Sequence, residues 1–279
     1  MLFWKKKKVE TPAQITTPQP EEFNTYGLHD ILHYIKREIG VDLFAKNSII
    51  ETKLKLFSER KGIYSFRKLF ELLSQDSTLR QELIDLVTVN ETYFYREESQ
   101  LELAVSFALN LPNGIKILCA PCASGEEVYS LAMMLYEKNR PSNSFYITGI
   151  DINSEAIDKA KNGVYSERSL HKLSPALKER FFNPRDKMYH IKKELFSCAN
   201  FHKVNIFEHS FLDMGEFDII FSRNMLIYFD DAFRLKTIER FAKLLKKDGK
   251  LFLGHADIIP DNAFFTKYTD AKLSYYVKK

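Results

Sequence analysis

Apolar residues between positions 27 and 89 recur at helical spacing. Leu28, Ile31, Leu32, Ile35 and Ile39 fall on one face of a helix that ends at Gly40. Three further runs show the same period, over residues 49–57, 66–73 and 79–87. Four short amphipathic helices in succession predict a small, all-helical N-terminal domain over residues 27–89.

From Ile115 onward, short apolar runs alternate with helical patterns. This alternation predicts a mostly parallel sheet with helices on both faces, within a domain that spans residues 99–279. We expect strands near 115–120, 145–150, 201–204, 217–221 and 250–255, and a closing pair at 264–268 and 273–277. Two weaker alternating runs, 188–191 and 194–199, predict a small antiparallel β insertion at about 186–200.

The turn after the first expected strand has the form of a cofactor crevice. Ala123, Ser124 and Gly125 follow the strand, and a helix begins near Glu126. The next strand ends in Asp151, where an acid can accept hydrogen bonds from ribose hydroxyls. The loop lacks the G-x-G-x-x-G spacing of a pyrophosphate cradle, so a nucleoside cofactor without a diphosphate fits better.

Polar residues follow several strands in turn. They are Gly125 to Glu127, Asp151, Asn205, and Ser222 to Asn224. Because the carboxyl ends of parallel strands meet at one edge of a sheet, these residues are expected to form one site.

Residues 90–97, Asn-Glu-Thr-Tyr-Phe-Tyr-Arg-Glu, are unusually aromatic for a linker. Together with Glu98 they form the predicted interdomain segment, 90–98. Three aromatic rings beside Arg96 can wall a cleft, since a ring face attracts a cation. Aromatic packing between two domains is the alternative interpretation.

Composition narrows the class of protein. The chain has 279 residues, of which 45% are hydrophobic, and a net charge of +4 without a long basic stripe. This pattern disfavours nucleic acid as the main partner. Residues 1–26, with four lysines and Pro, Thr and Gln, are expected to form a disordered tail.

Three cysteines, Cys119, Cys122 and Cys198, indicate a reducing compartment. Cys119 and Cys122 have C-x-x-C spacing, but without a second pair we predict packing residues and no metal site. The sequence contains neither an apolar stretch of about 20 residues that could span a bilayer nor a signal peptide, so a cytoplasmic protein is expected.

Five linked motifs resemble the CheR-type chemotaxis receptor methyltransferases. They are 90–97, Ala123-Ser-Gly-Glu-Glu with Tyr129-Ser130, Ile150-Asp-Ile, Ser222-Arg-Asn-Met-Leu-Ile-Tyr-Phe, and 244–255. The resemblance implies a Rossmann-like sheet that binds S-adenosylmethionine (SAM), a small β-subdomain and a helical N-terminal domain. It also implies methyl transfer to glutamate side chains in the cytoplasmic domain of methyl-accepting chemoreceptors, by a monomer.

By this resemblance, Arg96 and Tyr228 lie nearest the transferred methyl group, and Asp151 holds the ribose. The implied cofactor-binding residues are Asn90, Thr92, Arg96, Glu127, Asp151, Asn205, Ile206, Arg223 and Asn224. A glutamate carboxylate is already ionised near neutral pH, so no general base is needed. His255 is expected to be a structural histidine on a buried strand.

The sequence departs from the family pattern at a few positions. Val128 replaces the usual Pro after the acid pair, and Asp257 replaces a Glu. Family members often carry a row of Arg on the second helix, whereas this chain has Lys53 together with Leu56 and Glu59. Two alternatives stay open: a SAM-binding scaffold or sensor without receptor methylation, and a nucleic-acid methyltransferase.

Overall fold

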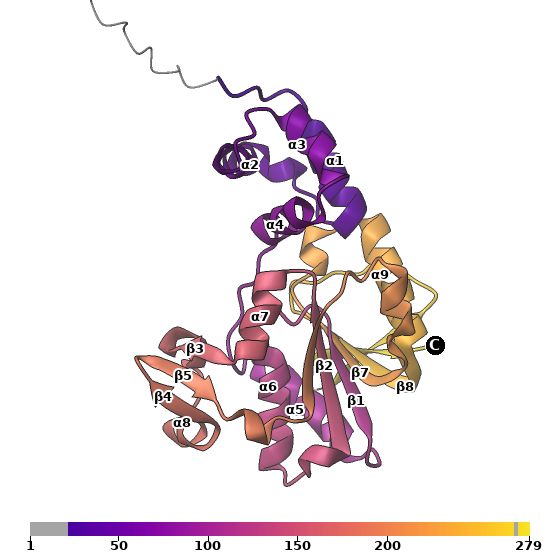
Figure 1. Cartoon of the computed structure of the whole chain (residues 1–279). Coiled ribbons are helices and arrows are strands. Elements are labelled where there is room, and N and C mark those ends of the chain that lie inside the picture. Colours follow the sequence, from indigo (N-terminus) through magenta and orange to yellow (C-terminus); the bar gives the residue numbers. More distant parts are fainter. Residues whose placement is uncertain (1–21, 271–272) are drawn as a thin grey trace, which may run out of the picture.

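The computed structural model describes residues 22–270 and 273–279 (Figure 1). Most of the predicted tail, residues 1–26, lies outside this range. In the part of the chain that the structure describes, no helix is both long and apolar enough to cross a membrane.

Four helices form the N-terminal part, as the apolar spacing predicts. They are α1 (Leu28–Ile39), α2 (Asn47–Arg60), α3 (Phe66–Leu73) and α4 (Ser77–Val87). Their apolar faces enclose a core of their own, in which Leu32, Leu54 and Phe66 are fully buried. Figure 1 shows this helical part stacked on the end of the sheet near α7 and α9.

The main sheet has seven strands in the order β6-β2-β1-β7-β8-β10-β9. Five strands run parallel, and β10 pairs antiparallel with both β8 and β9. The strands are β1 (Ile115–Cys119), β2 (Phe145–Asp151), β6 (Ala199–Lys203), β7 (Phe217–Ser222), β8 (Leu245–Leu253), β9 (Phe265–Asp270) and β10 (Leu273–Lys278). This confirms the predicted fold class, a mostly parallel α/β sheet.

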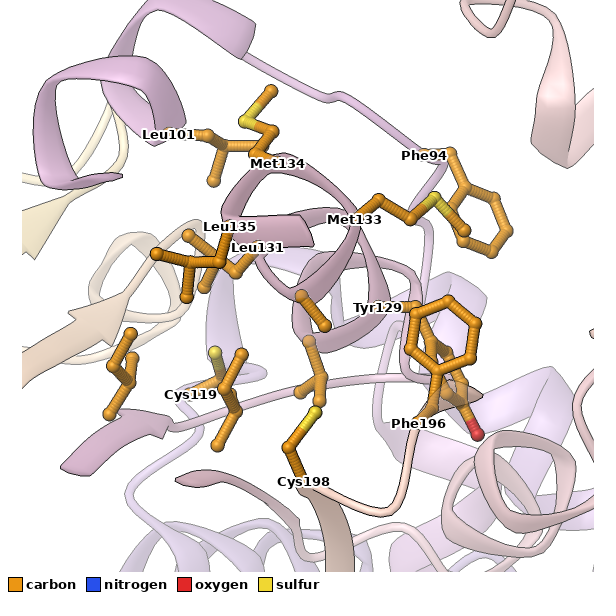
Figure 2. Close-up of a cluster of buried hydrophobic side chains, with 14 of the residues drawn as sticks. Phe94, Leu101, Cys119, Tyr129, Leu131, Met133, Met134, Leu135, Phe196 and Cys198 are labelled. Carbon is orange, nitrogen blue, oxygen red and sulfur yellow. The ribbon is translucent and has the colours of Figure 1, made fainter. Parts of the chain in front are cut away.

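Helices cover both faces of the sheet, because side chains alternate along each buried strand. In β1, Ile117 and Cys119 join the core under α5 (Glu98–Leu109), α6 (Glu126–Glu137) and α7 (Ser154–Asn162). Leu118 points to the opposite core, under α9 (Asp231–Leu244). Figure 2 shows the first core around α6, where Cys119 and Cys198 lie among apolar side chains. Both cysteines are free thiols that pack as small apolar groups.

A second, three-stranded antiparallel sheet projects beside α6 (Figure 1). Its strands are β3 (Val164–Ser166), β4 (Phe182–Arg185) and β5 (Met188–Ile191), with the short helix α8 (Pro175–Phe181) between β3 and β4. The insertion predicted at about 186–200 therefore has the wrong bounds. Asp186 and Lys187, both with positive φ, form a tight turn between β4 and β5, and these two strands pair antiparallel. Residues 193–195 form a 3₁₀ turn, and Ala199 begins β6 of the main sheet.

Candidate active site

A cleft of about 680 Å³ lies between the helical part and the carboxyl ends of the parallel strands. About half of its apolar lining comes from the N-terminal helices and their connections, including Ile39, Ile50 and Val87. Six of the residues predicted from the sequence line it: Asn90, Asp151, Asn205, Ile206, Asn224 and Tyr228. The carboxyl ends of β2, β6 and β7 thus meet in one site, as their chain order predicts.

The loop between β1 and α6 closes one side of this cleft. Gly125 has φ of 91°, a left-handed conformation that favours glycine. A Cβ atom on Gly125 would lie 2.9 Å from Cβ of Ala160 and 3.1 Å from the ring of Phe201. The loop therefore packs directly on α7 and β6, which requires both the conformation and the small size of glycine here.

Gly125→Ala is expected to destabilise the protein more than a matched glycine substitution elsewhere. Gly62 also has positive φ, of 70°, but a Cβ there would meet nothing within 4 Å. We expect Gly62→Ala to lower the free energy of unfolding by about 1 kcal/mol from backbone strain. Gly125→Ala should lose a further 1–3 kcal/mol or so from overpacking. Urea denaturation of both variants measures the difference, and equal losses would contradict the packing argument.

Asp151 lies at the end of β2 and is 4% exposed. Its Oδ1 accepts a hydrogen bond from the backbone N–H of Asn153, and its Oδ2 accepts one from Ala123, both at 2.9 Å. Burial raises the pKa of Asp151 to about 6, although these backbone donors act in the opposite direction. A carboxylate offers about four acceptor sites, and the backbone N–H groups of Asn153, Ala123 and Ile152 use at most three of them, so the group can still accept a hydrogen bond from a ribose hydroxyl.

SAM binding is expected to strengthen as pH rises through the pKa of Asp151. Protonation makes one carboxyl oxygen a donor, so the ionised form is the better acceptor for a ribose hydroxyl. With a pKa of about 6 in the protein without cofactor, affinity should fall between pH 7 and pH 5. Calorimetric titration of SAM across this range gives the measurement. In Asp151→Asn the affinity should be weaker and this pH dependence should disappear, and a persistent pH dependence would argue against Asp151.

The free energy of unfolding should show the opposite trend. Because burial raises the pKa of Asp151 above that of an unfolded chain, the protein without cofactor binds this proton more tightly when folded. The stabilising contribution of protonated Asp151 is complete below the unfolded pKa, near 4, and is lost as pH rises through about 6.

Glu127 and Arg223 form a buried ion pair behind the cleft. Arg223 Nε donates to Glu127 Oε2, and their side chains are only 4% and 9% exposed, respectively. Arg223 Nη1 donates to the backbone oxygen of Arg96 at 2.9 Å and lies 3.5 Å from Glu97 Oε2. Arg223 thus joins the loop after β7 to the interdomain segment and to the start of α6, although neither Arg223 nor Glu127 belongs to the cleft lining.

Asp257 fixes the backbone of the loop that follows β7. Its Oδ2 accepts hydrogen bonds from the N–H groups of Asn224 and Gly254, at 2.5 and 3.0 Å, and its Oδ1 accepts one from Ile227 at 3.3 Å. Asn224 has φ of 59°, and this clamp holds it in that conformation. The acid that replaces the family's usual Glu therefore orients the loop that carries Tyr228.

Asn205 connects the sheet to the helical part. Its Nδ2 donates to the backbone oxygen of Glu38 at 2.9 Å, and its Oδ1 accepts from the N–H of Phe207, also at 2.9 Å. The side-chain amide is therefore used within the protein, even though the residue lines the cleft. Ile206, next to it, presents an apolar wall.

Arg96 and Thr92 do not belong to the cleft lining, unlike Tyr228. Arg96 Nη1 donates to the backbone oxygen of Glu91 at 2.8 Å, and its guanidinium lies 5.9 Å from the centre of the Tyr93 ring. Burial raises the pKa of Tyr228, and the nearby charge of Arg96 opposes that rise. Arg96 and Tyr228, 132 positions apart in the sequence, are therefore close enough in space to interact electrostatically.

His255 differs from its predicted place. The strand β8 ends at Leu253, so His255 lies beyond it, with a side chain that is 63% exposed. Its Nδ1 lies 2.8 Å from Glu97 Oε2. The expected place of His255 on a buried strand is wrong, because Gly254 begins the turn closed by Asp257.

Sequence reasoning missed most of the apolar wall that the helical part contributes. Ile39, Ile50 and Val87 share the helical period of the core, so their pattern predicts packing and not a cleft. Each is buried within the N-terminal core and also borders the cavity. Only the way in which the two parts stack makes these residues part of the site.

The residues present fit SAM. Glu127 Oε1 is buried and has no hydrogen-bond partner in the part of the chain that the structure describes. It lies at the first turn of α6, behind the cleft lining, and an unpaired carboxylate oxygen there suits the ammonium group of an amino-acid moiety. Asp151 suits the ribose, and the apolar walls suit a nucleobase. Fold and cleft together define a SAM-dependent methyltransferase.

The chain belongs to the CheR methyltransferase family. The family model "CheR methyltransferase, SAM binding domain" matches residues 90–273. This range begins with the interdomain segment and includes every residue that we predicted for the site. SAM is accordingly the cofactor of this enzyme.

Curated relatives extend the similarity to most of the chain. A chemotaxis protein methyltransferase of Campylobacter jejuni subsp. jejuni serotype O:23/36 (strain 81-176) is 42% identical over 252 residues, covering 90% of this chain and 95% of that protein. The chemotaxis protein methyltransferase of Escherichia coli (strain K12) is 30% identical and covers 76% and 77%, respectively. A solved magnesium protoporphyrin IX methyltransferase from Synechocystis PCC 6803 with bound SAM shares 12% identity, covering 72% of this chain and 82% of that one, with a TM-score of 0.37. The family assignment rests on the family model and the curated relatives.

Proposed function

We propose that this enzyme transfers the methyl group of SAM to glutamate side chains of chemoreceptors, yielding a glutamate methyl ester and S-adenosylhomocysteine. The observation that carries this proposal is the cleft, in which Asp151 and Tyr228 lie in one lining and Arg96 lies within electrostatic range of Tyr228. The similarity to chemotaxis protein methyltransferases supports the choice of substrate. We further propose a cytoplasmic monomer whose partner is the cytoplasmic domain of the receptor.

The proposed roles divide the cleft into a cofactor side and a substrate side. Asp151 accepts from the ribose hydroxyls, Glu127 accepts from the ammonium group, and Ile206 lies against the adenine. Arg96 and Tyr228 orient the incoming carboxylate. The other residues proposed to contact SAM are Asn90, Thr92, Asn205, Arg223 and Asn224.

The main task of the protein in this reaction is to position the substrate carboxylate relative to the methyl group. When bound, SAM would supply the electrophilic methyl group of its sulfonium, and a new O–C bond to the substrate carboxylate would replace the S–C bond. The carboxylate is already ionised, so no residue has to remove a proton. Arg96 can hold one carboxylate oxygen by a charge-assisted hydrogen bond, and the Tyr228 hydroxyl can donate to it. Alignment and exclusion of water are the effects by which such a site accelerates transfer.

Labelled SAM and membranes that hold the cell's own receptors test the proposal. We expect base-labile label in the receptors, because glutamate methyl esters hydrolyse in base and N-methyl groups do not. Tight SAM binding by calorimetry without label in any receptor would favour a SAM-binding scaffold instead. Label in nucleic acid and not in receptors would support a nucleic-acid methyltransferase.

A further inference from the structure

One lysine near the end of α1 bridges the two parts of the molecule. Lys36 Nζ lies 2.7 Å from Asp42 Oδ2 and 2.8 Å from Asp230 Oδ2. Asp42 belongs to the connection that follows α1, and Asp230 caps the N-terminus of α9. A single ammonium group therefore joins the helical part to the loop that carries Tyr228.

Asp42 and Asp230 are each held by backbone hydrogen bonds next to the loop that carries Tyr228. The N–H of Asp42 donates to the backbone oxygen of Tyr228 at 2.9 Å. Asp42 Oδ1 also accepts from the N–H of Phe44 at 3.1 Å, while Asp230 Oδ1 accepts from Phe233 at 2.9 Å. Any shift of Asp42 relative to Asp230 is thus transmitted to the backbone of Tyr228.

The end of α1 is packed tightly against the sheet domain, which restricts its movement relative to the loop of Tyr228. Gly40 ends α1 with φ of 77°, and a Cβ there would lie 2.8 Å from the ring of Phe207 and 3.0 Å from that of Phe233. Next to it, the backbone oxygen of Glu38 accepts the hydrogen bond from Asn205. The end of α1 therefore packs both against the wall near Ile206 and against the first turn of α9, directly after the loop of Tyr228.

Without Lys36, the bridge would hold two like charges. The hydrogen bond from Lys36 is the main cause that lowers the pKa of Asp42 and that of Asp230, so both are ionised near neutral pH. Each side chain is partly buried, with exposures of 26%, 32% and 37% for Lys36, Asp42 and Asp230. Two such carboxylates repel each other when the cation between them is removed.

We propose that Lys36 is a positioning residue of the methyltransferase: by holding Asp42 and Asp230 together, it sets the place of Tyr228 in the cleft. The effect on turnover rests on the proposed function, whereas the effect on the backbone of Tyr228 does not. Lys36 itself contacts neither cofactor nor substrate in this scheme and is absent from the cleft lining.

The test compares Lys36→Met with the double variant Lys36→Met/Asp230→Asn. Lys36→Met should lower kcat by about 10- to 100-fold, since misplacing a reacting group by an ångström costs about that much. SAM affinity should stay close to that of the wild type. The double variant should recover much of kcat, because asparagine keeps the cap of α9, removes one of the repelling charges and can donate to Asp42. Lys36→Arg should retain activity.

Hydrogen exchange provides a readout that does not need the receptor. Peptides covering residues 40–46 and 225–231 should exchange faster in Lys36→Met and regain protection in the double variant. Lys68→Met, which removes an exposed lysine of α3, is the matched control and should change neither rate nor exchange. Unchanged kcat and exchange in Lys36→Met, or a double variant no better than the single one, would overturn the proposal. If the wild type methylates no receptor but exchange changes as expected, the proposed function fails and the positioning role stands.

Discussion

Arg96→Ala is expected to lower kcat for receptor methylation by about 10²–10³-fold, the usual loss for a donor that acts on the reacting charge. The positive charge of its guanidinium acts on Tyr228, where the substrate carboxylate is proposed to bind, and opposes the rise in the pKa of that residue. Binding of SAM should weaken much less than turnover, because Asp151, Glu127 and the apolar walls remain. Single-turnover transfer from labelled SAM, together with calorimetric SAM affinity, separates the two effects.

Arg168→Ala is the matched control for that experiment. Arg168 lies 3.5 Å from the carboxylate of Glu91, on the same segment that Arg96 contacts, but its side chain is 90% exposed. Its loss should leave turnover near that of the wild type. Arg96→Lys retains the charge without the planar fork and should be intermediate. Wild-type kinetics in Arg96→Ala would refute the proposed substrate side of the cleft.

Arg223→Met should produce the largest loss of stability. It removes the partner of Glu127 in a buried ion pair, and breaking such a pair typically costs about 3–5 kcal/mol because one charge stays buried alone. It also leaves the backbone oxygen of Arg96 without this donor. Urea denaturation with and without SAM measures the loss, and SAM affinity should fall as well.

Two variants distinguish the buried charge from the loss of side-chain volume. Arg223→Met/Glu127→Gln removes both charges, so it should be more stable than Arg223→Met alone. Arg185→Met disrupts an exposed pair with Asp186, and should cost no more than about 1 kcal/mol. A double variant as unstable as Arg223→Met would show that an uncompensated charge is not the cause.

The sheet could be predicted from the sequence because its buried strands are short apolar runs, each bounded by polar or turn residues. Runs such as Ile115–Cys119 and Phe217–Ser222 lie where the alternation places them. Three of the polar residues that follow the strands, Asp151, Asn205 and Asn224, line the same cleft, since parallel order brings those strand ends together. The helix α5 was not predicted, because its apolar residues follow the aromatic run of the interdomain segment without a distinct cap.

Side-chain contacts between residues that are far apart in the sequence could not be predicted from local patterns. Glu127 and Arg223 are 96 residues apart, and nothing near either of them indicates that they share a buried ion pair. Asn205 looks like a ligand residue, yet its amide is used to attach the helical part. The cap of α7 is Asn153, which accepts from the N–H of Ala156, while the neighbouring Ser154 bonds to Asp85 across the two parts of the molecule. These details depend on how two folded parts stack.

The strand order has a consequence for how the chain folds during synthesis. β10, the last strand in chain order, lies between β8 and β9, so the sheet cannot close until its final strand has left the ribosome. The N-terminal helices enclose a core of their own and can form earlier, as domains generally do when they emerge first. Until β10 inserts, β8 presents an open edge to other chains, which makes this interval the one most exposed to aggregation.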